Sequence, residues 1–192
     1  ASDAISTVIR RRFAADVSLS STESDFLDRL GRGARRSQVS GDLLQRESAE
    51  DPTPQFILTG WAAHEHVLDD GRRQLLSILI PGDSFGFLPT SARRALSSVR
   101  ALTSVEVVDG SALRVAVRQS HRFPNLSQAH AAVQAERQSL LVDHLVRLGR
   151  RDAVARVVHL LLELHFRSKR IGAVEEDAFP MPLTQVMFGE LL

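Results

Sequence analysis

Two small clusters of side chains have the types and spacing needed for binding chemistry. Arg93 and Arg94 place adjacent guanidinium groups in one loop, where they could hold an anion; the alternative is that both are solvated. His64 and His66 lie two residues apart in an apolar run, so on a strand both imidazoles would share one face and could ligate a metal. The sequence shows no third ligand for them, and we therefore predict no metal site.

Motifs for catalysis are absent from the sequence. It has no Gly-x-Ser-x-Gly nucleophile turn, no glycine-rich phosphate loop and no His-Glu-x-x-His pair. It also has no cysteine, which excludes disulfides, thiolate zinc sites and Cys-ligated iron–sulfur clusters within this chain. We therefore expect neither enzymatic activity nor a cofactor.

Length and composition fit an ordinary globular chain, with 192 residues, 43% apolar and 24% charged. The formal net charge is +1, so overall charge does not indicate a nucleic-acid partner. Lys169 is the one lysine among 24 basic side chains. This arginine excess suits phosphate and carboxylate recognition, but a GC-rich gene would produce the same bias. No apolar stretch is long enough for a transmembrane helix and no signal-peptide pattern is present, so we expect a cytoplasmic protein.

The elements that would carry these side chains change character along the chain. Residues 1–36 have a polar, helical pattern that ends near Gly31-Arg32-Gly33. After residue 36, turn signals such as Asp70-Gly71 separate short apolar runs. This spacing is typical of an antiparallel sandwich or barrel built from hairpins. The expected strands lie within residues 56–58, 61–68, 74–80 and 99–108.

Residues 125–148 contain no Gly or Pro and predict one long helix. At about 1.5 Å per residue such a helix is about 36 Å long, more than the β domain beside it requires. We therefore expect it to pair with its own copy in a homodimer; the alternative is a helix lying along the β domain. Glu136 and Arg137 interrupt its apolar pattern. The predicted dimer interface is Leu126, Ala129, Val133, Leu141, Leu145 and Leu148.

Two more helices are predicted after this one. The first begins at Ala153, carries a broad apolar face and ends before Gly172. The second follows Thr184, which is a good N-cap residue. A helix that buries Leu191 and Leu192 would need a following segment to cover it. We therefore expect the sequence to be truncated at its C-terminus.

Several segments in fixed order carry a family resemblance. The β part contains Gly60-Trp61-Ala62, Leu68-Asp69-Asp70-Gly71-Arg72-Arg73-Gln74 and Leu79-Ile80-Pro81-Gly82-Asp83; Leu148-Gly149-Arg150-Arg151-Asp152-Ala153 and Pro182-Leu183-Thr184-Gln185 follow the long helix. Together they resemble the Crp/Fnr family of bacterial transcription regulators. The resemblance implies an α+β fold with an antiparallel, jelly-roll-like β-roll sensor domain and N-terminal helices in residues 1–124. A dimerisation helix would follow in 125–149, and an incomplete winged helix-turn-helix domain in 150–192.

The same resemblance implies an effector pocket in the β-roll. Family members that bind cyclic nucleotides carry a Gly-Glu-Leu segment, whose Glu holds the ribose, and an Arg-Ser or Arg-Thr pair, whose Arg holds the cyclic phosphate. Here Phe87 stands at the Glu position and Ala95-Leu96 at the Arg-Ser position, so we expect no cyclic AMP binding. The pocket residues implied for an unidentified small effector are Gly82, Asp83, Phe85, Gly86, Phe87, Arg93 and Arg94.

The resemblance also implies that the complete protein binds double-stranded DNA and meets RNA polymerase. Thr184 and Gln185 would lie near the phosphate backbone, although Thr184 would also suffice as a simple helix cap. The base-reading helix that should come next is not in the sequence, so we expect this chain to dimerise but to bind DNA weakly. The alternative function is a stand-alone β-roll module that binds a small molecule without DNA.

Overall fold

Eight antiparallel strands form two four-stranded sheets in the computed structural model, which describes residues 5, 7–88, 93–150, 152–174 and 178–192. One sheet has the order β1-β8-β3-β6 and the other the order β2-β7-β4-β5. The strands are β1 (Arg35–Gln38), β2 (Leu43–Gln45), β3 (Gln55–Thr59), β4 (Ala62–Val67), β5 (Arg73–Leu79), β6 (Ser84–Phe85), β7 (Ser98–Ala101) and β8 (Val105–Asp109). This is the predicted β-roll, and the expectation of an antiparallel sandwich is confirmed.

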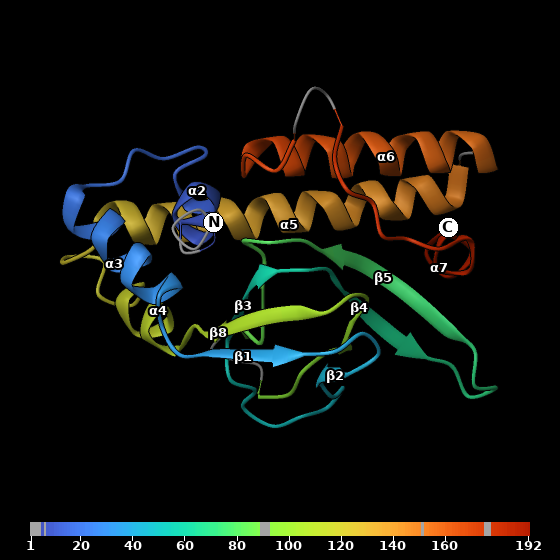
Figure 1. Ribbon diagram of the computed structural model, residues 1–192, viewed down its shortest axis with the longest axis horizontal. Helices are drawn as coiled ribbons and strands as arrows, with labels where there is room; N and C mark the ends of the chain where they lie inside the picture. Colours follow the sequence, from blue (N-terminus) through green and yellow to red (C-terminus); the bar gives the residue numbers. More distant parts are fainter. Residues whose placement is uncertain (1–4, 6, 89–92, 151, 175–177) are drawn as a thin grey trace.

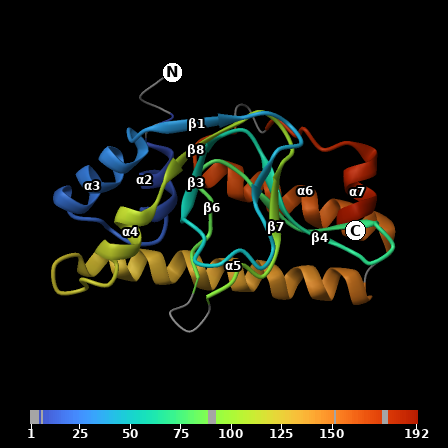
Figure 2. The same cartoon turned by 90° about the horizontal axis from the view of Figure 1, so that it is seen from below.

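Helices cover one side of this β-roll. They are α2 (Val8–Phe13), α3 (Ser21–Gly31), α4 (Ser111–Ala116), α5 (Pro124–Arg150), α6 (Ala153–Arg170) and α7 (Gln185–Leu191). Figure 1 shows α5 and α6 running side by side above the strands, with α2 and α3 at one end and α7 near β5 at the other. Figure 2 shows that α5 spans the whole length of the β-roll. No helix of the described residues combines the length and apolar character needed to cross a bilayer.

The apolar runs in the sequence correctly predicted strands, whereas the strands outside these runs were not predicted. The runs at 56–58, 61–68 and 74–80 form β3, β4 and β5, and the Asp70-Gly71 turn joins the last two. The run at 99–108 is two strands, because Thr103 accepts a hydrogen bond from the Trp61 amide at 2.9 Å and fixes a turn there. Gly60 adjoins that turn with φ +77, and a Cβ on it would lie 2.0 Å from the Ser104 carbonyl oxygen. The polar strand β1, the three-residue β2 and the two-residue β6 were not predicted.

A buried carboxylate ties the N-terminal helices to the start of α5. Ser20 caps α3 by accepting a hydrogen bond from the Glu23 amide, and the Glu23 carboxylate accepts one from the Ser20 amide. Glu23 also accepts hydrogen bonds from the Leu126 amide at 2.9 Å and from the Asn125 side chain at 3.1 Å. Burial would raise the pKa of Glu23, but these hydrogen bonds hold it below its usual value. One side chain therefore fixes the starts of two helices.

One hydrophobic core runs from the N-terminal helices through the β-roll to the C-terminal helices. It joins Trp61 and Ile78 of the β-roll to Leu160 and Leu164 of α6 and to Leu191 of α7. Leu191 is 1% exposed, so the chain itself covers a residue that was expected to need a following segment. Leu160 and Leu164 of α6 and Leu191 of α7 thus share one core with the β-roll, and the division at residues 124 and 149 stays a prediction.

Candidate functional site

A cavity of about 300 Å³ lies between the β-roll and α5. The strands supply His64 and Ser77, the loop after β6 supplies Phe87, and α5 supplies Gln134 and Arg137. Gln134, Arg137 and Leu141 follow one another at intervals of three and four, so they share one face of α5. The complete lining is His64, Leu76, Ser77, Gly86, Phe87, Leu88, Leu96, Ser97, Gln134, Arg137 and Leu141.

Arg137 is the cation of this cavity. Its Nη1 donates a hydrogen bond to the Ser84 carbonyl oxygen of β6 at 3.0 Å, and its Nη2 contacts His64 Nε2. No carboxylate of a described residue forms an ion pair with it. Burial lowers the pKa of Arg137; nearby Asp83 opposes this shift and Arg167 adds to it. The cavity therefore presents a largely buried guanidinium group whose charge the surrounding chain does not neutralise directly.

His64 is neutral in this setting. Burial lowers its pKa to about 3, and the charge of Arg137 acts in the same direction, against a smaller opposing effect of Asp83. Because Nε2 faces the guanidinium N–H, we assign it as the acceptor. Nδ1 then carries the proton and donates it to Ser97 Oγ at 2.8 Å. His64 thus holds Arg137 in place without adding charge to the cavity.

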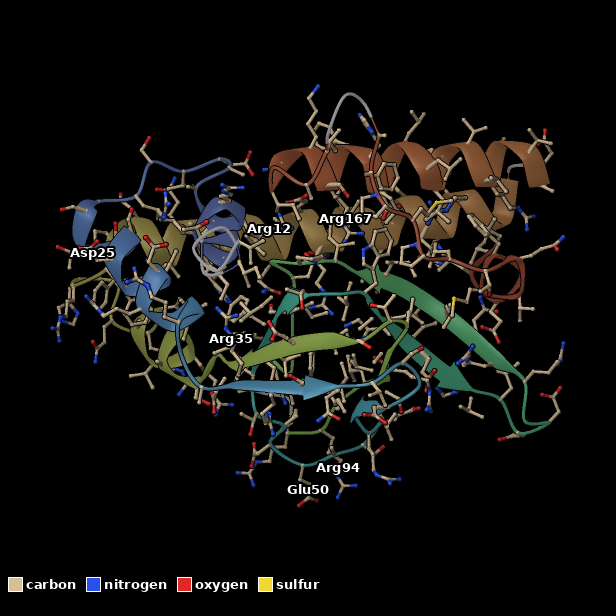
Figure 3. All side chains as sticks on the ribbon, in the orientation of Figure 1. Arg12, Asp25, Arg35, Glu50, Arg94 and Arg167 are labelled. Atoms are coloured by element: carbon tan, nitrogen blue, oxygen red, sulfur yellow. The ribbon has the colours of Figure 1, made fainter. Side chains whose placement is uncertain are left out.

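A buried ionic cluster lies beside the cavity, between α2, α5, α6 and the turn before β6. Asp83 forms ion pairs with Arg167 at 2.5 Å and with Arg12 at 3.4 Å, and accepts a hydrogen bond from the Ile80 amide. Burial would raise the pKa of Asp83, but Arg167, Arg12 and that amide hold it below its usual value. Figure 3 shows Arg12 and Arg167 in the layer where the helices meet the strands.

The structure brings only part of the predicted effector pocket together. Gly86 and Phe87 line the cavity. Phe85 is 1% exposed in the core between the sheets, and Gly82 packs against α2 and Ile171. Asp83 belongs to the buried ionic cluster instead of the cavity wall.

Arg93 and Arg94 lie outside the cavity. Both are exposed, and Arg94 forms an ion pair with Glu50 at 2.5 Å. Figure 3 shows Arg94 and Glu50 at the edge of the β-roll farthest from α5 and α6. The solvated alternative therefore describes this arginine pair better than the anion-binding one. Sequence reasoning missed His64, Ser97, Gln134 and Arg137 as cavity residues.

His64 and His66 do not converge. A register shift in β4 falls between His64 and Glu65, and His66 faces Glu47, whose Oε2 lies 2.9 Å from its Nδ1. Among the residues that the structure describes, no group of three or more His, Asp or Glu side chains has the arrangement of a metal site.

The predicted dimer residues fall into two groups along α5. Leu126 and Ala129 are 0% and 1% exposed in the protomer's own core, so they do not face a second copy. Leu141 and Leu145 are 43% and 68% exposed. Val133 is partly buried beside the ionic cluster, Leu148 is partly buried, and the exposed Val142 and Val146 were not predicted.

Thr184 and Gln185 begin the last helix. Thr184 caps α7 by accepting a hydrogen bond from the Met187 amide at 3.3 Å, as its sequence position predicts. Gln185 is exposed beside it. The other end of α7 is held by Glu190, which forms an ion pair with Arg73 of β5 at 2.6 Å. Contact of Thr184 and Gln185 with DNA stays a prediction.

No family model matches the chain, but two of its relatives are nitrogen fixation regulation proteins named FixK. The chain is 29% identical over 140 residues to the nitrogen fixation regulation protein FixK of Azorhizobium caulinodans. The matched region covers 73% of this chain and 53% of that protein. The chain is also 29% identical over 184 residues to FixK of Bradyrhizobium diazoefficiens. That matched region covers 95% of this chain and 74% of that protein. The chain thus spans about half the length of the first relative and three quarters of the second.

Solved structures agree with these relatives. FixK2 from Bradyrhizobium japonicum superposes with a TM-score of 0.67 and 25% identity, covering 83% of this chain and 76% of that one. The c-di-GMP responsive regulator CLP of Xanthomonas campestris shares the fold with a TM-score of 0.56, at 18% identity, over 80% of this chain and 73% of that one. Its sequence relatives and its fold support a regulator of the Crp/Fnr type.

Proposed function

We propose that this protein is a DNA-binding transcription regulator that acts as a homodimer and whose β-roll does not bind cyclic AMP. The observation that carries the proposal is the exposed apolar surface on the second half of α5, on a chain related to FixK. Leu141, Val142, Leu145 and Val146 are 43%, 54%, 68% and 49% exposed. Four large apolar side chains that gather on two turns of one helix are typical of a protein–protein interface.

Pairing through this half of α5 would set the distance between two DNA-reading modules. Two such modules must lie about 34 Å apart to meet successive major grooves of one duplex. A further apolar stripe on α6, formed by Val154, Val158, Leu162 and Phe166, is 48–74% exposed. We expect the remaining helices of a winged helix-turn-helix domain to pack on that stripe in the complete regulator.

Sedimentation velocity at micromolar concentration tests the dimer. The proposal expects a species of twice the 21.2 kDa chain mass. Leu145→Glu should weaken the dimer at least about 30-fold, because pairing would bury a carboxylate without a partner. Val115→Glu is the matched control, since Val115 is also exposed, at 58%, but lies on α4. A wild-type protomer that sediments alone contradicts the dimer.

Two features of the cavity support the absence of cyclic AMP binding. Phe87 occupies the place where a ribose-binding carboxylate is expected, and none of the described residues that line the cavity is acidic. Arg93 and Arg94 lie outside the cavity. Isothermal titration should therefore detect no cyclic AMP binding at submillimolar concentration, and micromolar affinity would contradict this part of the proposal.

DNA binding separates the regulator from the alternative, a stand-alone β-roll module. Protein from the full-length gene, mixed with fragments of the source genome, should retain specific fragments in a mobility-shift assay. Its affinity should fall steeply with rising salt, because phosphate contacts release counterions. A ligand-binding module would retain no fragment at any salt concentration.

A further inference from the structure

The buried and partly buried arginines where the helices meet the strands are not equivalent. Arg12, Arg147, Arg167 and Arg170 each form ion pairs with one or more of Asp83, Glu136 and Glu163. Arg137 lies among them, yet no described carboxylate pairs with it. Carboxylates raise the pKa of Arg167 against the effect of burial, whereas burial lowers the pKa of Arg137. Asp83 partly opposes that shift but forms no ion pair with Arg137. A largely buried cation without an ion pair is costly unless an anion pairs with it.

The cavity at Arg137 has the size and character of a small-molecule site. Its volume of about 300 Å³ is at the lower end for ligand pockets. Most of its wall is apolar, including Phe87 of the loop after β6, Leu141 of α5 and Leu76 of β5. Ser77, Ser97 and Gln134 add polar groups that can orient a ligand. The guanidinium group uses one N–H on the Ser84 carbonyl oxygen and one on His64, which leaves N–H donors for a ligand.

We propose that this cavity binds a small organic carboxylate with an apolar body, whose charged group is held by Arg137. A single arginine balances a single negative charge, so a monoanionic carboxylate leaves no excess charge in the apolar cavity. Inorganic phosphate carries up to two negative charges at neutral pH and would leave one unpaired. A nucleotide would bring ribose hydroxyl groups to a wall whose described residues include no acidic side chain to accept them.

The site adjoins the surface proposed for pairing. Leu141 lines the cavity and is also 43% exposed on the second half of α5, one turn after Arg137. A ligand that orders Leu141 would change the apolar surface that a second copy meets. Binding itself requires neither pairing nor DNA, so the failure of this inference and the failure of the proposed function are measured separately.

Thermal unfolding with defined probes tests the site. Phenylacetate and hexanoate should each raise the Tm by about 3–6 °C at a concentration about ten times their Kd. Phenylacetamide and hexanamide have the same bodies without the charge and should have no effect. If the carboxylates give no rise up to tens of millimolar, or if amides and carboxylates give the same rise, the proposal is overturned. It is also overturned if only inorganic phosphate or cyclic AMP stabilises the protein.

Variants identify the residue. Arg137→Gln retains a donor for the Ser84 carbonyl oxygen but removes the charge, and it should weaken carboxylate binding at least about 30-fold. Arg94→Gln is the matched control, because Arg94 is an exposed arginine outside the cavity, and it should bind like the wild type. Arg137→Lys keeps the charge without the planar fork and should bind with intermediate affinity, which provides a second readout if Arg137→Gln does not fold. Equal binding by the wild type and both Arg137 variants would overturn the assignment.

Discussion

The two halves of α5 have similar apolar spacing but opposite surroundings. In the first half, Leu126 and Ala129 are buried in the protomer's own core, and Glu136 forms an ion pair with Arg12 of α2 at 2.6 Å. In the second half, Leu141 and Leu145 are exposed to 43% and 68%. Helical periodicity therefore indicates which residues need a partner surface, but not whether that surface belongs to the same chain.

The largest expected effect comes from truncating matched leucines in the two halves. Leu126→Ala should lower the free energy of unfolding by about 2–5 kcal/mol, because it leaves a cavity in the core. Leu145→Ala should cost at most about 0.5 kcal/mol in the isolated protomer, because the side chain is already exposed. Urea unfolding of both variants, at a concentration where the protein is monomeric, measures the contrast. Equal losses at the two positions would remove the distinction between the halves.

A smaller effect is expected where the first half ends. Glu136 accepts from Arg12 at 2.6 Å and pairs with Arg170 at 3.3 Å, and its side chain is 18% exposed. Glu136→Gln should therefore lower the free energy of unfolding by about 1–3 kcal/mol, since Arg12 and Arg170 each lose one of their two carboxylate partners. Glu106→Gln is the matched control: its pair with Arg35 is more exposed, at 34% and 27%, and should contribute at most about 1 kcal/mol. A cost at Glu106 as large as at Glu136 would contradict this ranking.

The smallest effect concerns pH and the contact between His64 and Arg137. The pKa of His64 is lowered to about 3 in the folded protein, so between about pH 3 and pH 6.5 the unfolded chain binds a proton that the folded chain does not. Stability should therefore fall as pH decreases through this window, with His64 contributing about 1.4 kcal/mol per pH unit at most. His64→Asn should reduce the slope measured by urea unfolding at pH 4.5, 5.5 and 6.5. An unchanged slope in His64→Asn would contradict this assignment.

Local patterns in the sequence predicted helices and strands, but they did not predict a cavity formed by residues that are far apart in the chain. Apolar runs predicted β3, β4 and β5, and the Gly-free stretch predicted α5, because both patterns are local. The cavity was predicted only in part, because Arg137 and His64 are 73 positions apart and meet only through the fold. One signal did exist, because Glu136 and Arg137 interrupt the apolar pattern of α5. Glu136 forms an ion pair with Arg12, and Arg137 donates a hydrogen bond to the Ser84 carbonyl oxygen. Arg93 and Arg94 had the right chemistry, but both lie outside the cavity, and Arg94 lies on the far edge of the β-roll (Figure 3).

Cysteine cross-linking tests the central claim, that the second half of α5 faces a second copy, most directly. The natural chain has no cysteine, so a single introduced thiol reports on one position. Leu145→Cys should form a covalent dimer on mild oxidation, because pairing would bring the two thiols within disulfide distance. Gln128→Cys, exposed on the first half of the same helix, should stay monomeric on a non-reducing gel. Cross-linking at residue 128 without cross-linking at residue 145 would contradict the account.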